Sequence, residues 1–161
     1  DACRIFYLMR SNDQSLDFDL ELAKSKSNEN PVFYIQYAHA RVASVMKELA
    51  ARSLAYDPTA AADIVATQGA HLLSGAHAEA MLSCLSRYPE VIRQAADQRA
   101  PHALVHYLKE LATTLHAFYN AERVLVPEND LRQARVYALL AVQQALRNGL
   151  GILGASAPET M

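Results

Sequence analysis

Apolar residues recur at helical spacing along two long stretches of this chain. Steps of three or four residues separate Leu104, Leu108, Leu111, Leu115 and Phe118, and similar steps separate Ile35, Ala38, Val42, Val45 and Leu49. Such a stripe makes one face of a helix apolar, and that face leaves water by packing against other helices. The composition agrees, because 52% of the residues are hydrophobic and only 5 glycines and 6 prolines occur. We therefore predict an all-α fold, a bundle of four or five helices with short links.

Capping residues predict where the long helices begin and end. Asn30 can cap free backbone N–H groups and Pro31 suits the first helical position, so a helix should start here and run to about Ser53. The acidic stretch 128–130 predicts the start of a last helix, and Gly149 predicts its C-terminal stop. The stripe of that helix is Leu131, Ala138, Val142 and Leu146.

Other segments have weaker patterns. Residues 1–10 are compatible with helix or strand, and we favour helix, whereas residues 16–20 alternate strictly and carry the only strand signal. Between Tyr56 and Gly75 the period blurs, so we expect an irregular connection. Helical spacing returns after Gly75, and Pro89 should divide that region into two short helices.

Composition excludes several classes of protein. The formal charge of -2 and pI of about 6.3 indicate no general basic footprint for nucleic acid. No apolar run reaches the ~18 residues that cross a bilayer, and no signal peptide is visible, so we expect a cytoplasmic protein. Cys3 and Cys84 lack metal-site spacing and should be reduced thiols. The chain begins without methionine inside an apolar segment, which suggests part of a longer protein.

Three polar clusters on the predicted helices could bind a ligand. They comprise Gln36, Tyr37, His39 and Arg41; His116, Tyr119 and Asn120; and Arg132, Arg135 and Tyr137. Spacing alone favours ordinary amphipathic helices, although exposed aromatic side chains could stack on unpaired bases. His102 and His106 lack the intervening glutamate of a helical zinc motif. Without a phosphate loop, a nucleophile elbow or paired carboxylates on one helix, the chain should be a binding module and not a catalyst.

Two regions resemble one enzyme family. The residues Leu16-Asp17-Phe18-Asp19 and the run from Glu29 to Arg41 closely resemble arginyl-tRNA synthetases where the catalytic domain meets the anticodon-binding bundle. Phe118-Tyr119-Asn120, the run from Asn148 to Gly154 and the closing residues 157–161 resemble the C-terminus of the same family. The family's DALR motif corresponds here to residues 129–132, Asn-Asp-Leu-Arg, and its first alanine-like position departs from the pattern.

The resemblance implies an anticodon-binding helical bundle at residues 29–161, preceded at 1–28 by a remnant of the catalytic junction. It implies that the bundle binds the anticodon arm of tRNA(Arg) and adjoins the catalytic domain of the same parent. The candidate tRNA-binding residues are Gln36, Tyr37, His39, Arg41, His116, Tyr119, Asn120, Arg132, Arg135, Tyr137 and Met161. The nucleotide-binding signatures are missing, so no catalysis and no cofactor are expected here, while the full-length arginine-tRNA ligase would use ATP and magnesium.

Two alternatives remain open from the sequence. The bundle pattern and low charge also suit a helical protein-interaction module with no role in RNA binding. A related bundle from another class I synthetase, such as the cysteine enzyme, is the second alternative. The run from Gln36 to Arg41 favours the arginine enzyme.

Overall fold

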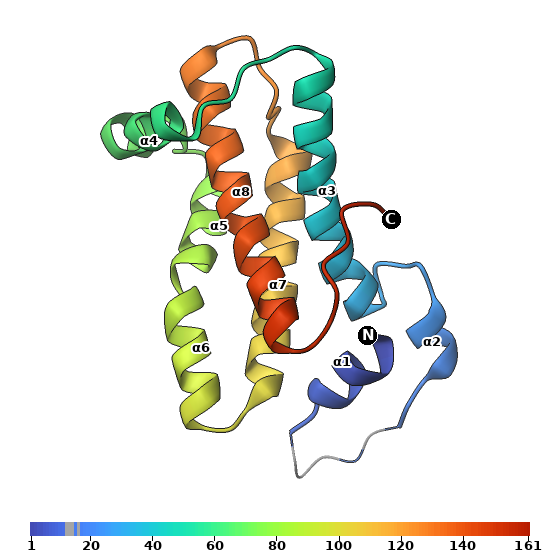
Figure 1. Ribbon diagram of the computed structural model, residues 1–161. Helices are drawn as coiled ribbons and strands as arrows, with labels where there is room; N and C mark the ends of the chain where they lie inside the picture. Colours follow the sequence, from blue (N-terminus) through green and yellow to red (C-terminus); the bar gives the residue numbers. More distant parts are fainter. Residues whose placement is uncertain (12–14, 16) are drawn as a thin grey trace.

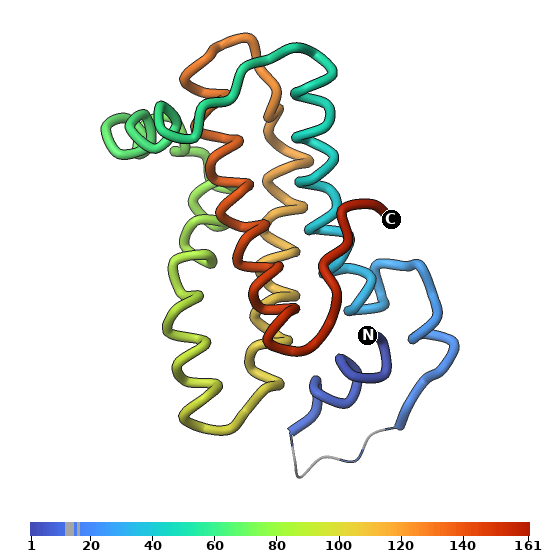
Figure 2. The backbone as a smooth tube through the Cα atoms, viewed as in Figure 1, coloured from blue at the N-terminus to red at the C-terminus, as the bar shows by residue number. Residues whose placement is uncertain are grey.

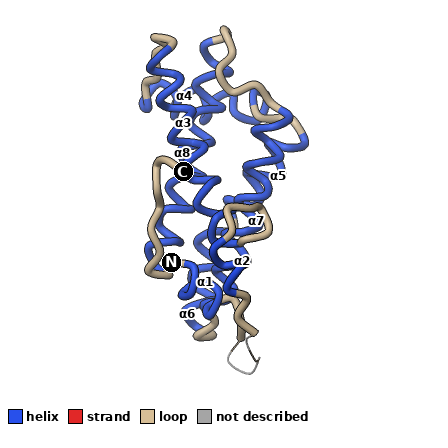
Figure 3. The backbone as a smooth tube through the Cα atoms, turned by 90° about the vertical axis from the view of Figure 1, so that its right-hand side faces the viewer, coloured by secondary structure: helices blue, strands red, loops and turns tan. Residues whose placement is uncertain are grey.

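The computed structural model describes residues 1–11, 15 and 17–161, and within these residues it contains helices and loops but no strand (Figures 1 and 3). The helices are α1 (Ala2–Leu8), α2 (Leu20–Lys24), α3 (Pro31–Ala51), α4 (Pro58–Leu72), α5 (Ala76–Ser86), α6 (Tyr88–Asp97), α7 (Pro101–Ala121) and α8 (Asn129–Ile152). The prediction of an all-α bundle is therefore confirmed, although the described residues form eight helices and not the four or five expected.

The long helices α3, α7 and α8 pack against one another and form the centre of the bundle. Helices α5 and α6 follow each other along α7, and α4 crosses beside α8 (Figure 1). The predicted stripes of α3 and α7 face this core, since all ten residues named for them are buried. In α8, Ala138, Val142 and Leu146 are buried as predicted, whereas Leu131 is only partly buried.

The predicted start of α3 is confirmed, and so is the division at Pro89. The Asn30 side chain accepts hydrogen bonds from the N–H groups of Val32 and Phe33, which caps α3. Pro101 lies in the first turn of α7, and α5 ends at Ser86, just before α6 begins at Tyr88. The start of α8 falls inside the predicted acidic stretch, although Glu128 makes no side-chain capping bond.

The predictions for residues 56–75 and for Gly149 are wrong. The connection expected between Tyr56 and Gly75 is largely the helix α4, which Asp57 caps by accepting hydrogen bonds from the N–H groups of Thr59 and Ala60. Its apolar residues pack on α8, so tertiary contact compensates for a weak period. Gly149 is also not a helix stop: it is buried inside α8 against Leu108.

The N-terminal residues lie at the start of α3. Helix α1 contacts α2, α3 and α7, which confirms the preference for helix there. Residues 17–19 are not a strand and Leu20 begins α2, because Asp19 caps that helix by accepting from the Leu22 N–H group. Residues 12–14 of the predicted turn and Leu16 of the strand signal lie outside the described residues.

Candidate nucleic-acid interface

Arg41 lies between two aromatic rings. Its guanidinium carbon is 5.0 Å from the ring centroid of Tyr37, one turn earlier on α3, and 4.6 Å from that of Tyr119 on α7. Nη2 donates a hydrogen bond to the Tyr37 hydroxyl (3.2 Å), and Nη1 lies 3.1 Å from Nδ1 of His116 on α7. Cation–π attraction and these hydrogen bonds hold the planar guanidinium in one orientation.

His116 is buried beneath Arg41 and is a neutral hydrogen-bond acceptor. Its ring centroid lies 4.8 Å from that of Tyr34 and 5.5 Å from that of Tyr37. Burial lowers the pKa of His116 to about 4, and the positive charge of Arg41 acts in the same direction. The imidazole is therefore unprotonated at neutral pH, and its Nδ1 lone pair accepts from Arg41.

A pocket of about 230 Å³ opens beside the Arg41 guanidinium. Its lining residues are Tyr37, Ala40, Arg41, Ser44, Tyr119 and Met161. Tyr119 is 37% exposed and Met161 is 55% exposed, so aromatic, cationic and apolar groups meet here at the molecular surface. We call this opening the Arg41 pocket.

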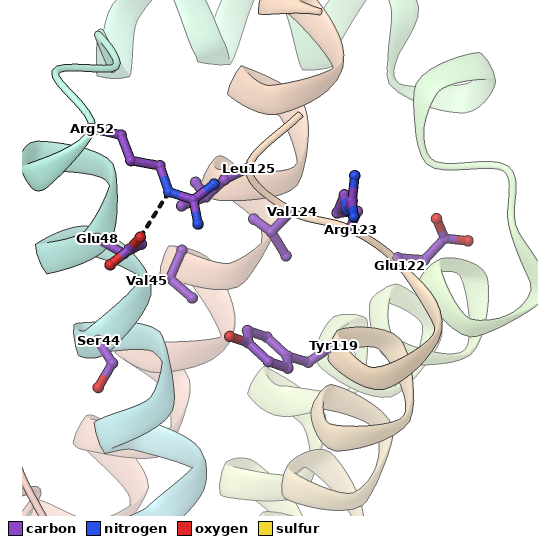
Figure 4. Close-up of a pocket in the computed structure, with 9 residues that line it drawn as sticks. All are labelled: Ser44, Val45, Glu48, Arg52, Tyr119, Glu122, Arg123, Val124 and Leu125. Atoms are coloured by element: carbon purple, nitrogen blue, oxygen red, sulfur yellow. Dashed lines mark hydrogen bonds and ion pairs between the residues drawn. The ribbon is translucent and has the colours of Figure 1, made fainter. Parts of the chain in front are cut away.

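A larger opening of about 670 Å³ shares Ser44 and Tyr119 with the Arg41 pocket. It lies between α3 and the segment that joins α7 to α8, and the Tyr119 hydroxyl points toward α3 (Figure 4). Its lining residues are Ser44, Val45, Glu48, Arg52, Tyr119, Glu122, Arg123, Val124 and Leu125. Arg52 forms a 2.7 Å ion pair with Glu48, and the surface here is mainly polar. The two openings together are called the α3–α7 groove.

The groove contains residues that were not predicted from the sequence, notably Ser44, Arg52 and Arg123. Helical spacing places Ser44 and Arg52 near the edge of an amphipathic helix, where a solvated side chain is the ordinary expectation. Arg123 follows α7 in a loop whose path depends on long-range contacts. No local signal distinguishes these residues, because they become neighbours only when the loop folds against α3.

Five of the predicted tRNA-binding residues meet at or beneath the groove: Tyr37, Arg41, His116, Tyr119 and Met161. Asn120 is exposed next to Tyr119 but does not line either opening. Tyr137 lines a separate, mainly apolar opening between α4, α5 and α8. The structure thus brings together about half of the predicted set.

The remaining predicted residues make contacts inside the molecule. Gln36 and His39 are buried on α3 and contact residues near the C-terminus. Arg132 is 6% exposed, and its guanidinium donates to the backbone oxygens of Val126 (2.8 Å) and Pro127 (2.9 Å). Arg135 pairs with Glu122 (2.5 Å) and donates to the Arg123 carbonyl. These arginines therefore hold the loop that forms one wall of the groove.

Among the described residues, no group of three or more His, Cys, Asp or Glu side chains could hold a metal ion. No described helix is both long enough and apolar enough to cross a membrane.

The helical bundle is that of an anticodon-binding domain. Residues 35–161 match the family model of the DALR anticodon binding domain, and the chain belongs to this family. Among its relatives are arginine–tRNA ligases, which are 53% identical in Coxiella burnetii (strain CbuK_Q154) and 49% in Thioalkalivibrio sulfidiphilus. Both comparisons cover 100% of this chain, but 26% and 27% of the relatives, so the chain spans about a quarter of their length.

A solved structure has the same fold. The arginyl-tRNA synthetase of Thermus thermophilus superimposes with a TM-score of 0.79 at 29% identity, covering 99% of this chain and 26% of the synthetase. The predicted resemblance to arginyl-tRNA synthetases is therefore confirmed. The chain corresponds to the anticodon-binding part of such a ligase.

Proposed function

We propose that this chain binds the anticodon arm of tRNA(Arg), and that the α3–α7 groove receives unpaired bases of the anticodon loop. The observation that carries the proposal is Arg41 held between Tyr37 and Tyr119 at a surface pocket. Aromatic faces bind bases by stacking, each with ~1 to 3 kcal/mol, and a fixed guanidinium adds charge and hydrogen-bond donors. The family match of residues 35–161 supports the same ligand class.

The predicted residues then have different roles in binding. Tyr37, Arg41, Tyr119 and Met161 would contact the loop, with Asn120 beside them. His116 would fix the Arg41 orientation, and Arg132 and Arg135 would hold the wall that carries Arg123. Tyr137 lies on a different opening and would contribute only through the packing of α8.

In this proposal the full-length protein is a cytoplasmic arginine–tRNA ligase that attaches arginine to tRNA(Arg) with ATP and magnesium. Residues 29–161 form its anticodon-binding domain and residues 1–28 are the end of the catalytic junction. The start of the family match at residue 35 and the position of α1 and α2 beside the first turns of α3 support this division (Figure 1). This chain alone would bind tRNA without catalysing the reaction.

Titration of the 161-residue chain with two RNA hairpins tests the proposal. One hairpin carries the anticodon stem and loop of tRNA(Arg), and the other carries the same stem with exchanged anticodon bases. We expect tighter binding of the first hairpin, measured by fluorescence anisotropy at low salt. Equal affinity for both hairpins would contradict anticodon recognition.

Replacement of Tyr119 tests the groove itself. Tyr119→Ala should weaken binding of the tRNA(Arg) hairpin about tenfold, because one stacking face is lost. Tyr7→Ala removes another exposed tyrosine, on α1 and outside the groove, and should leave the affinity unchanged. A similar loss of hairpin affinity in both variants would indicate that the RNA binds outside the α3–α7 groove.

A further inference from the structure

Residues 153–161 leave the end of α8 and run back beside α3, as Figures 1 and 2 show. The reversal is a Schellman turn, in which the Ala155 N–H group donates to the Leu150 carbonyl (2.8 Å) and the Gly154 N–H group to the Gly151 carbonyl (3.0 Å). Gly154 has a φ of 69°, which glycine adopts without strain. The segment, called the C-terminal strap here, ends at Met161 in the Arg41 pocket.

Asp1, Gln36 and Ser156 form the first attachment of the strap. One carboxylate oxygen of Asp1 accepts hydrogen bonds from the Ser156 N–H group (3.0 Å) and from the Gln36 amide (2.9 Å). The same Gln36 amide donates to the Ser156 carbonyl (3.0 Å). Hydrogen bonds to an ionised carboxylate are stronger than neutral ones, so this attachment fixes the start of the strap.

His39 forms the second attachment and is completely buried. Its Nδ1 lies 2.8 Å from the Pro158 carbonyl, which can only accept, so Nδ1 carries the proton and donates. Its Nε2 is then the acceptor, and Nε of Arg147 donates to it (3.4 Å). Arg147 also reaches Glu159 (3.7 Å), which lies between Pro158 and Met161. Both ring nitrogens of His39 therefore help to hold the strap, Nδ1 directly and Nε2 through Arg147.

The strap attachments and the binding residues alternate along α3. Gln36 and His39 are three residues apart and face the strap, whereas Tyr37 and Arg41 follow them by one and two residues and face the pocket. The same helical turns thus fix both the aromatic wall and the path of the chain that carries Met161. Met161 itself is 55% exposed, so its own packing contributes little to its position.

We infer that Gln36 and His39 are positioning residues, which with Asp1 hold the strap so that Met161 forms one wall of the Arg41 pocket. The inference rests on the proposed function, and the ligand is an unpaired nucleobase of the anticodon loop. Tyr37 and Tyr119 supply flat faces, while the flexible, polarizable side chain of Met161 closes the pocket around the base. Gln36 and His39 act on the RNA through the strap and do not touch it.

Variants of His39 separate this role from a direct contact with RNA. His39→Leu removes the donor to Pro158, whereas His39→Asn places an amide N–H group where Nδ1 donates. We expect His39→Leu to weaken binding of the tRNA(Arg) hairpin about fivefold and His39→Asn to restore most of it. Amide hydrogen exchange of residues 155–161 should become faster in His39→Leu and remain slow in His39→Asn.

Asp1→Ala is the second variant, chosen because Asp1 is exposed and its replacement leaves the core intact. It should speed exchange at the Ser156 N–H group and weaken hairpin binding in the same way. A chain shortened after Ser156 should bind as weakly as His39→Leu, and adding His39→Leu to it should cause no further loss.

The outcomes distinguish the two proposals. If the unaltered chain binds the tRNA(Arg) hairpin and the shortened chain binds equally well, the strap is not part of the site and the inference is overturned, while the proposed function stands. A further loss from His39→Leu in the shortened chain would also overturn it, since His39 would then act without the strap. If the unaltered chain does not bind the hairpin, the proposed function fails and the inference fails with it.

Discussion

The hydrogen bond between Arg41 and His116 exists only while the imidazole is unprotonated. The folded-state pKa of His116 is lowered from 6.5 to about 4, chiefly by burial. Between these pH values the unfolded chain binds a proton at this residue and the native chain does not. Stability therefore falls as the pH falls from 6.5 toward 4, and the loss stops near the lower value.

Unfolding in urea at pH 7 and pH 5 measures this effect. His116 should lower the free energy of unfolding by about 2 kcal/mol at pH 5 relative to pH 7, because each pH unit below the unfolded-state pKa costs about 1.4 kcal/mol of stability. His116→Asn keeps an acceptor for Arg41 near the Nδ1 position but does not titrate. Between pH 7 and pH 5 the free energy of unfolding of this variant should therefore fall by about 2 kcal/mol less than that of the unaltered chain. Equal losses in the two proteins would show that His116 is not the group responsible.

Arg132 shows what residue patterns can and cannot reveal. Its place in the first turn of α8 is predictable, an arginine there opposes the helix dipole, and it was one of the candidate tRNA-binding residues. The structure instead buries the guanidinium, where it donates to Val126, Pro127 and the side chain of Asn129. These acceptors belong to the α7–α8 loop and the first turn of α8, and the loop's path is not encoded in helical spacing.

At the scale of the helices, starts were more predictable than ends. Asn30 caps α3 through its own side chain, so a short sequence contains the whole interaction. Helices α3 and α6 end with Ser53 and Arg99 at φ of 53° and 51°, a conformation that usually selects glycine. Neither α3 nor α6 therefore has the glycine that usually marks a helix end in the sequence, although α3 was still expected to end near Ser53.

The two glycines of α8 near its end provide a matched test of helix packing. A Cβ atom on Gly149 would lie 2.5 Å from Cδ2 of the buried Leu108, whereas one on Gly151 would meet nothing within 4 Å. Gly149→Ala should destabilise the chain by roughly 1 to 3 kcal/mol, because α7 and α8 must separate or Leu108 must leave its rotamer.

Gly151→Ala should have the opposite effect on the free energy of unfolding and stabilise the chain by about 0.5 to 1 kcal/mol, since alanine loses less backbone entropy than glycine on forming a helix. Thermal or urea unfolding of both variants gives the comparison. A stabilising Gly149→Ala would mean that the α7–α8 contact is looser than the structure shows.

On the scale of the whole molecule, the charge is low and the proposed RNA site has few cations. The chain carries a formal charge of -2, and the arginines at the groove are Arg41, Arg52 and Arg123. Arg52 is already paired with Glu48. Binding should therefore depend more on stacking and shape than on counterion release from phosphates.

The salt dependence of hairpin binding tests this balance. With about one to three phosphate contacts in a single-stranded loop, the slope of log K against log salt should lie between about -0.7 and -2.1. Arg123→Ala should reduce the steepness by about 0.7 if Arg123 contacts one phosphate. A slope steeper than about -4 would require a wider basic surface than the groove provides.

The sequence by itself determined the all-α class, the core stripes of α3 and α7, and the polar residues available on α3. These features depend on helical periodicity and capping, which act over a few residues. Only the tertiary structure decided that α4 is a helix, that Arg132 faces inward, and that Gln36 and His39 hold the C-terminal strap while Tyr37 and Arg41 face the groove. These outcomes depend on contacts between residues far apart in the chain, and such contacts leave no periodic pattern in the sequence.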